Sequence, residues 1–151
     1  MDPGDRDFRF GADFVLDDVN QGESDDGNNL VQRGLNGDGT QFKLQADNGL
    51  ASCYVEGDQG SVTVRSEVSI AAGSWYGVTC SREGDEVTLV LESESGEELD
   101  TVTRGGRVGS LVFEPSVPLT MGGKLTPEGD VVRGESDQLN GALDNVFVHV
   151  E

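Results

Sequence analysis

A strict alternation of apolar and other side chains near the start of the chain limits what it can fold into. It covers nine residues, and its apolar members are Phe8, Phe10, Ala12, Phe14 and Leu16. Successive side chains of a β-strand point to opposite faces, so this period of two predicts a strand with one buried face. Such a strand has to bury its apolar face against a second layer, which favours a layered β-fold.

The rest of the chain consists of short extended segments that are separated by turns containing glycine. Asp47-Asn48-Gly49 predicts a two-residue hairpin turn, because Asn-Gly accepts positive φ at both central positions. No segment of eight or more residues has convincing helical periodicity, and no internal repeat or linker divides the chain. We therefore predict one all-β domain over residues 1–151, an antiparallel β-sandwich or jelly roll. Its strands are expected at 8–16, 30–33, 41–46, 50–56, 61–66, 74–82, 86–92, 99–103, 108–113, 119–121 and 140–150.

The charge balance narrows the possible partners and the environment. The 151 residues carry a net charge of −19, from 29 acidic and 10 basic residues, and Lys43 and Lys124 are the only lysines. An acidic, lysine-poor surface stays hydrated in multi-molar salt, where charge repulsion is screened within about 3 Å. This predicts a protein of a halophile or of a virus that infects one; the alternative is an ordinary acidic secreted or calcium-collecting domain. Binding to nucleic acids or anionic membranes is disfavoured, and no apolar run reaches membrane-spanning length.

Two cysteines, Cys53 and Cys80, make up the whole thiol content, and each lies in a predicted strand. An even count in a surface-type β-domain indicates one disulfide; the alternative is two buried free thiols. The opening residues lack the basic-then-apolar segment of a signal peptide. Either a leader was removed before Met1, or the protein reaches the outside without one. We expect an extracellular, cell-surface or virion-surface location.

Several phrases along the chain occur in the order of a known family. They are the opening strand 7–14, the tryptophan-containing hairpin 74–92, the glycine-rich phrase 118–124 and the closing strand 141–150. Together they resemble the laminin-G-like branch of the concanavalin A-like lectin-glucanase jelly rolls, over about residues 5–150. The resemblance implies a surface recognition module. A secreted bacterial subgroup places cysteines as Cys53 and Cys80 are placed, which supports the disulfide, whereas the family's extra N-terminal strand is missing here.

The resemblance also suggests a metal site. The family's closing aspartate corresponds to Asp144, where sheet edges meet, and backbone carbonyls near residues 5–7 could complete a Ca²⁺ site. The alternative is an aspartate that caps a local turn. The acidic loop 17–26 is a weaker calcium candidate, without EF-hand spacing.

Three aromatic residues are candidates for ligand contact. Trp75 is expected in the core from its family position, and Tyr54 and Tyr76 flank the two cysteines, so at least one of these tyrosines should be exposed. Jelly rolls commonly bind glycans through exposed aromatics at one edge or on the concave face. Tyr54 and Tyr76 are therefore the candidate ligand-binding residues.

No arrangement of residues predicts catalysis. Glu92 and Glu94 share the two-residue spacing of a glucanase carboxylate pair, but the segment runs into an acidic turn and lacks the rest of that motif. His149, the only histidine, has no nucleophile arranged around it in sequence. We therefore expect no enzyme activity, and a glycoside hydrolase is the least favoured function.

The favoured hypothesis is a noncatalytic module that binds glycans or a cell-surface protein. The alternative is a structural subunit that assembles, decorates or forms a spike on a virion or surface layer, as a homo-oligomer or in a larger assembly. A neighbouring chain could then fill an open sheet edge.

Overall fold

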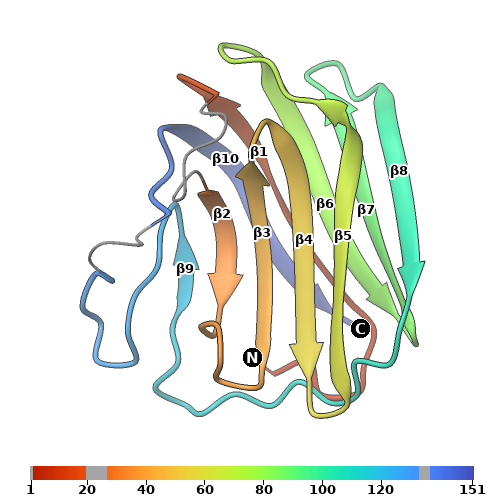
Figure 1. Cartoon of the computed structure of the whole chain (residues 1–151), viewed down its shortest axis with the longest axis vertical. Helices are drawn as coiled ribbons and strands as arrows, with labels where there is room; N and C mark the ends of the chain where they lie inside the picture. Colours follow the sequence, from red (N-terminus) through yellow and green to blue (C-terminus); the bar gives the residue numbers. More distant parts are fainter. Residues whose placement is uncertain (1, 20–26, 133–136) are drawn as a thin grey trace.

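The computed structural model describes residues 2–19, 27–132 and 137–151, and these contain strands and loops but no helix (Figure 1). The predicted all-β class is confirmed: ten strands form two five-stranded antiparallel sheets. No helix of these residues could therefore cross a membrane. The strands are β1 (Phe8–Leu16), β2 (Asn28–Arg33), β3 (Gln41–Asp47), β4 (Leu50–Gly57), β5 (Gly60–Ser69), β6 (Trp75–Glu83), β7 (Glu86–Ser93), β8 (Glu98–Gly105), β9 (Leu119–Met121) and β10 (Gly141–Val150).

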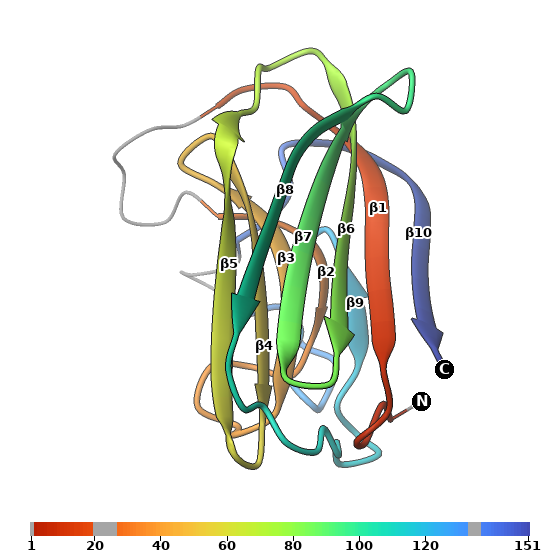
Figure 2. The same ribbon diagram turned by 90° about the vertical axis from the view of Figure 1, so that its right-hand side faces the viewer.

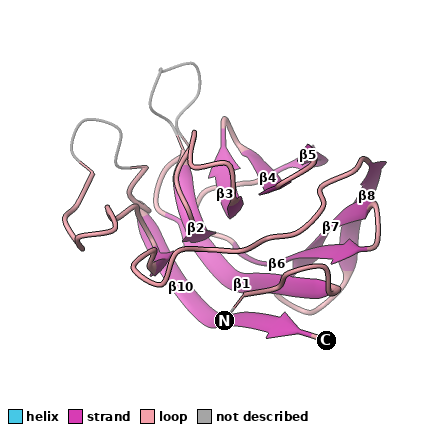
Figure 3. Ribbon diagram, turned by 90° about the horizontal axis from the view of Figure 1, so that it is seen from below, coloured by secondary structure: helices cyan, strands magenta, loops and turns pink. Residues whose placement is uncertain are grey.

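The two sheets stack face to face, as Figures 2 and 3 show. The first sheet has the order β10-β1-β6-β7-β8, and the second has the order β5-β4-β3-β2-β9. The long strand β1 lies inside the first sheet because it pairs with β6 on one side and β10 on the other. The first and last strands of the chain are therefore neighbours, and β10 forms an edge.

An apolar core fills the space between the sheets, and the alternation of β1 supplies one side of it. Phe8 and Phe10 are almost fully buried, and both rings meet Phe42 of β3 across the sheets, with centroids 5.6 and 4.7 Å apart. Phe113 meets Phe42 edge-on at 5.8 Å. Aromatic pairs at such separations add about 0.5–1.5 kcal/mol each beyond the area they bury. This cluster therefore holds one end of the sandwich closed.

The predicted hairpin between β3 and β4 forms as expected. Asn48 and Gly49 have φ values of 51° and 75°, the positive values that a type I′ turn needs at both central positions. The hairpin sets the register of the two strands, in which Lys43 lies opposite Tyr54 and Leu44 opposite Cys53. The turn thereby decides which side chains of β4 share a face with those of β3.

One predicted strand, 108–113, is wrong. The segment is irregular and makes a single bridge, between Leu111 and Gly4. Val108, Leu111 and Phe113 are buried, whereas Val112 is exposed. The carbonyls of Val108 and Ser110 accept hydrogen bonds from the β4–β5 turn instead of from a strand. Apolar residues that close the end of a sandwich do not need the alternation of a strand.

The two cysteines form the expected disulfide, and it joins the two sheets. Cys53 lies in β4 of the second sheet and Cys80 in β6 of the first, with Cα atoms 6.1 Å apart and both side chains fully buried. The bond closes a loop with a sequence separation of 27 residues. It thus restricts the unfolded chain as well as fastening the layers.

Removing this bond is expected to destabilise the fold strongly. In the double variant Cys53→Ala/Cys80→Ala, the free energy of unfolding should fall by about 3–4 kcal/mol, because the unfolded chain regains the entropy of the open loop. Urea unfolding followed by tryptophan fluorescence measures the change. Reduced wild-type protein is the control, and an unchanged unfolding midpoint in both would contradict the prediction.

Candidate functional site

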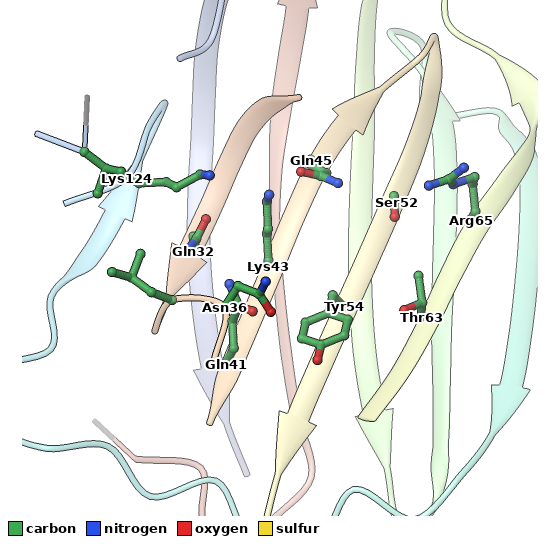
Figure 4. A pocket seen from close by; sticks show the side chains of 12 residues that line it. Gln32, Asn36, Gln41, Lys43, Gln45, Ser52, Tyr54, Thr63, Arg65 and Lys124 are labelled. Atoms are coloured by element: carbon green, nitrogen blue, oxygen red, sulfur yellow. The ribbon is translucent and has the colours of Figure 1, made fainter. Parts of the chain in front are cut away.

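A cavity of about 510 Å³ lies on the outer face of the second sheet (Figure 4). This volume falls within the roughly 300–1,000 Å³ of small-molecule sites. Its floor is a row of side chains that crosses four neighbouring strands, because strand register places Gln32 opposite Lys43, Lys43 opposite Tyr54, and Tyr54 opposite Thr63. The cavity is lined by Gln32, Leu35, Asn36, Gln41, Lys43, Gln45, Ser52, Tyr54, Thr63, Arg65, Lys124 and Val132.

Side-chain amides are fixed along one side of this cavity. Asn29 donates a hydrogen bond to Gln32 Oε1 at 2.7 Å, and Gln32 Nε2 donates to the Gly34 carbonyl at 2.6 Å. Gln41 Nε2 donates to the same carbonyl at 3.3 Å. Gln32 and Gln41 are 2% and 4% exposed, so their orientations are set by packing as well as by hydrogen bonds. A ligand would meet preoriented amides here.

A carboxylate bridges two lysines at the β9 side of the cavity. Asp137 Oδ2 lies 3.0 Å from Lys43 Nζ and 2.7 Å from Lys124 Nζ, and all three side chains are at most 16% exposed. Asp137 also reaches the sheet through its backbone, since its carbonyl accepts a hydrogen bond from Asn29 N. Asp137 is therefore held to the second sheet by both its side chain and its backbone, and Lys124 joins it there through the shared carboxylate.

The bridge shifts the protonation of its members in directions that follow from burial and charge. Burial lowers the pKa of the Lys43 ammonium, against the opposing charge and hydrogen bond of Asp137. Burial alone would raise the pKa of Asp137, but the hydrogen bond from Lys124 and the charge of Lys43 outweigh it and lower that pKa. Asp137 is therefore held as a carboxylate.

Tyr54 is the aromatic member of the cavity. It lies on the outer face because Cys53 and Val55, its neighbours in β4, point into the core. Burial raises the pKa of the Tyr54 phenol, and the neighbouring Glu56 carboxylate adds to that shift. The phenol therefore keeps its proton and remains a hydrogen-bond donor.

Tyr76, the second candidate, lies elsewhere. Its ring packs against Phe14 with centroids 5.8 Å apart, and its hydroxyl accepts a hydrogen bond from Ala71 N. The expectation that Trp75 is a core residue is wrong. Val78 and Cys80 face inward, so the alternation of side chains along β6 places Trp75 on the outer side, where it is half-buried. Tyr76 and Trp75 border a second cavity of about 250 Å³ on the first sheet. The structure thus separates Tyr54 from Tyr76 and places them on different sheets.

Asp144 lies in β10 opposite Asp13 of β1, beside the second cavity. A bulge precedes this pair, and Asn145, with φ of 49°, donates a hydrogen bond to Asp13 at 2.6 Å.

Asp7 lies at the other end of β1, next to Glu151, so carbonyls near residues 5–7 cannot join Asp144 as the sequence suggested. Among the described residues, no group of three or more His, Cys, Asp or Glu side chains could hold a metal ion. The acidic loop 17–26 lies mostly outside those residues.

The remaining residues considered for catalysis are scattered. Glu92 lies near the end of β7 opposite Gly77, whereas Glu94 lies in the turn that follows the strand. His149 is exposed in the edge strand β10, paired with Arg9. These three residues therefore do not form one constellation on a shared strand face.

Sequence reasoning identified Tyr54 but missed the amides and lysines around it. Gln41, Lys43 and Gln45 alternate with buried apolar residues in β3, so their shared outward face was readable from the sequence. Their meeting with Lys124 and Asp137 was not, because those residues approach from a distant part of the chain.

Comparisons with known proteins show the fold. No family model matches the chain, and no curated protein matches its sequence. The LG1-3 region of the laminin alpha2 chain superimposes with a TM-score of 0.75 at 14% identity, over 95% of this chain and 27% of that one. Domains LG4-5 of the mouse laminin alpha1 chain give 0.67 at 14%, over 95% and 35%. The enzymatically active domain of tailspike protein 2 from bacteriophage CBA120 gives 0.60 at 15%, over 97% and 22%.

The chain therefore has a laminin-G-like sandwich fold, and it spans no more than about a third of the length of these structures. Its Cys53–Cys80 disulfide is of the kind that forms and persists in oxidising surroundings, such as the cell exterior.

The carboxylate bridge is expected to stabilise the fold in a pH-dependent way. Because the pKa of Asp137 is lower in the folded state, its contribution is complete above the ordinary value near 3.8 and is lost as the pH falls through the lowered one. Asp137→Asn should therefore lower the free energy of unfolding by about 1–2 kcal/mol at neutral pH, between the values of exposed and buried pairs.

Urea unfolding of both proteins between neutral and strongly acidic pH tests this prediction. The difference between wild type and variant should shrink as the pH falls below about 4. Asp130→Asn, which changes an exposed aspartate of the same loop, is the control. A difference that stays constant with pH, or that the control reproduces, would contradict a role for the bridge.

Proposed function

We propose that this protein is a noncatalytic recognition module that binds glycans through the outer-face cavity of the second sheet. The observation that carries the proposal is the setting of Tyr54, an aromatic ring surrounded by fixed amides and hydroxyls in a cavity of ligand size. Sugar rings offer C–H faces to an aromatic ring and hydroxyls to amide and hydroxyl partners. The cavity provides both kinds of contact side by side.

The location of the cavity also supports recognition from outside. It occupies the face of a sheet rather than the core, and most of its lining residues come from the paired strands β2, β3, β4 and β5. Sites on strands hold their geometry better than sites on loops. An extracellular, cell-surface or virion-surface module of a halophile or its virus would meet glycans on that face.

A structural role in an assembly is the second candidate, and the edges of the sheets favour it. β10 is a ten-residue edge strand with Phe147 38% exposed, and β9 at the edge of the second sheet exposes Leu119 and Met121. Exposed apolar edges are sites where another chain can add a strand. The likeness to a phage tailspike domain is compatible with such a role as a spike or decoration subunit.

Oligomeric state distinguishes the two functions. In light scattering at about 2–3 M salt, where repulsion between acidic surfaces is screened, a recognition module should remain a monomer at all concentrations. A stable symmetric oligomer with no affinity for glycans would instead support the assembly role. Repeating the measurement with a chelator tests whether calcium, which the sequence suggested at Asp144, affects the oligomeric state.

Glycan binding should depend on Tyr54. We expect Tyr54→Ala to weaken binding about tenfold, equivalent to about 1.4 kcal/mol, because the sugar loses its aromatic contact. Titration calorimetry with short neutral and acidic oligosaccharides measures the affinity. Tyr76→Phe, on the other sheet, is the control. Equal affinities of the Tyr54→Ala protein and wild type would place the glycan site elsewhere.

A further inference from the structure

Positive charge gathers in this cavity although the chain is strongly acidic. Both lysines of the chain and Arg65 line it, and no Asp or Glu is among its lining residues in the described part of the chain. The two next cavities have the opposite character, since Asp13, Glu94 and Asp144 line one and Asp38 and Glu114 line the other. The whole chain has 29 acidic and 10 basic residues. The charge of this cavity therefore differs in sign from that of the chain as a whole.

The lysines keep unused capacity for an anion. Lys43 and Lys124 share one carboxylate oxygen of Asp137, so two ammonium groups face a single negative charge. Each ammonium has three donors, and the bridge uses one of them. Both side chains are only 16% exposed, which reduces screening by water and salt. The two lysines therefore outnumber the carboxylate they share, at a partly desolvated position, whereas Arg65 forms a separate ion pair with Asp47 at 3.5 Å.

The excess charge lies next to the aromatic ring. Lys43 is the direct cross-strand neighbour of Tyr54, and adjacent strands lie about 4.8 Å apart. Arg65 is on the opposite flank, because it lies in β5, on the other side of β4 from Lys43 in β3. Its cross-strand partner Ser52 lies on the same face of β4 as Tyr54, two residues earlier. Figure 4 shows the lysines and the arginine on either side of the tyrosine. A sugar ring over Tyr54 would bring its substituents within reach of these cations.

We propose that the ligand is an anionic saccharide, whose carboxylate or sulfate group binds between Lys43 and Lys124 while its ring stacks on Tyr54. This inference rests on the proposed glycan-binding function and specifies its chemical class. Charge-assisted hydrogen bonds are about twice as strong as neutral ones, so the anion would provide selectivity. The half-buried Gln45 and the exposed Thr63 also line the cavity and offer partners for the neutral hydroxyls.

The chemistry of the lining favours a saccharide over an acidic peptide. The groups around the cations are side-chain amides, two hydroxyl-bearing residues and a phenol, which match a ligand dense in hydroxyls. The cavity lies on a sheet face, where strand backbone groups are already paired, so a peptide could not add as a strand there.

The test compares four probes on the full chain by titration calorimetry: an oligogalacturonate, a sulfated galactan oligosaccharide, a neutral cello-oligosaccharide of the same length, and an oligoglutamate peptide of the same charge. The variants are Lys43→Gln, Lys124→Gln and Arg65→Gln. Arg9→Gln is the matched control, because it removes the same charge from an exposed position in the first sheet. Thermal unfolding verifies that each variant folds, and Arg65 is exposed enough that its variant should fold in any case.

We expect at least one anionic saccharide to bind about tenfold or more tightly than the neutral one, and its affinity to fall with added salt. Each lysine variant should lose about tenfold for that probe, and Arg9→Gln should lose nothing. The preferred anion identifies carboxylate or sulfate as the group recognised.

Other outcomes would overturn the inference in distinguishable ways. Equal binding of neutral and anionic saccharides, unaffected by the lysine variants, would overturn the anionic class and leave glycan binding intact. If the oligoglutamate binds as tightly as the saccharides, the site recognises negative charge alone and has no preference for a sugar. Failure of every saccharide to bind the folded protein would overturn both this inference and the proposed function.

Discussion

The contact between the two sheets is the interaction on which the rest of this structure depends. Phe10 of β1 and Phe42 of β3 meet across the interface, and the Cys53–Cys80 bond fastens the layers next to this contact. A sandwich can bury only one face of each sheet, so this packing fixes which side chains of every strand are inside. Their alternate neighbours are then forced to face outward. The outer surfaces are therefore a consequence of the core.

This alternation of inward and outward side chains explains why the two candidate ligand-binding tyrosines have different surroundings. Tyr54 and Tyr76 lie in the two strands that carry the disulfide, but Tyr54 immediately follows Cys53, whereas Tyr76 is four residues before Cys80. One step along a strand reverses the face and four steps restore it. Tyr54 consequently lies in the outer cavity, while Tyr76 packs its ring on Phe14. The same counting places Trp75 outside the core, contrary to the position that its family resemblance suggested.

The carboxylate bridge adds a second level of organisation to the outer face. Asp137 and Lys124 come from the segment between β9 and β10, and they meet Lys43 in the middle of the second sheet. The bridge brings the chain's two lysines together and thereby creates a positive cavity on a molecule with a net charge of −19. Net charge describes the average surface and solubility of a protein, whereas recognition depends on the local arrangement.

The sequence by itself determined the all-β class, most strand positions, the hairpin at Asn48–Gly49 and the outward position of a tyrosine beside a cysteine. These features depend on the alternation of apolar residues and on turn residues, which are determined by residues close together in the sequence. Only the tertiary structure decided that 108–113 closes the sandwich end instead of forming a strand, that Asp144 is remote from residues 5–7, and that Lys43, Lys124 and Asp137 form one group. These contacts join segments far apart in the chain, and their geometry is set by sheet order and packing, which no local pattern encodes.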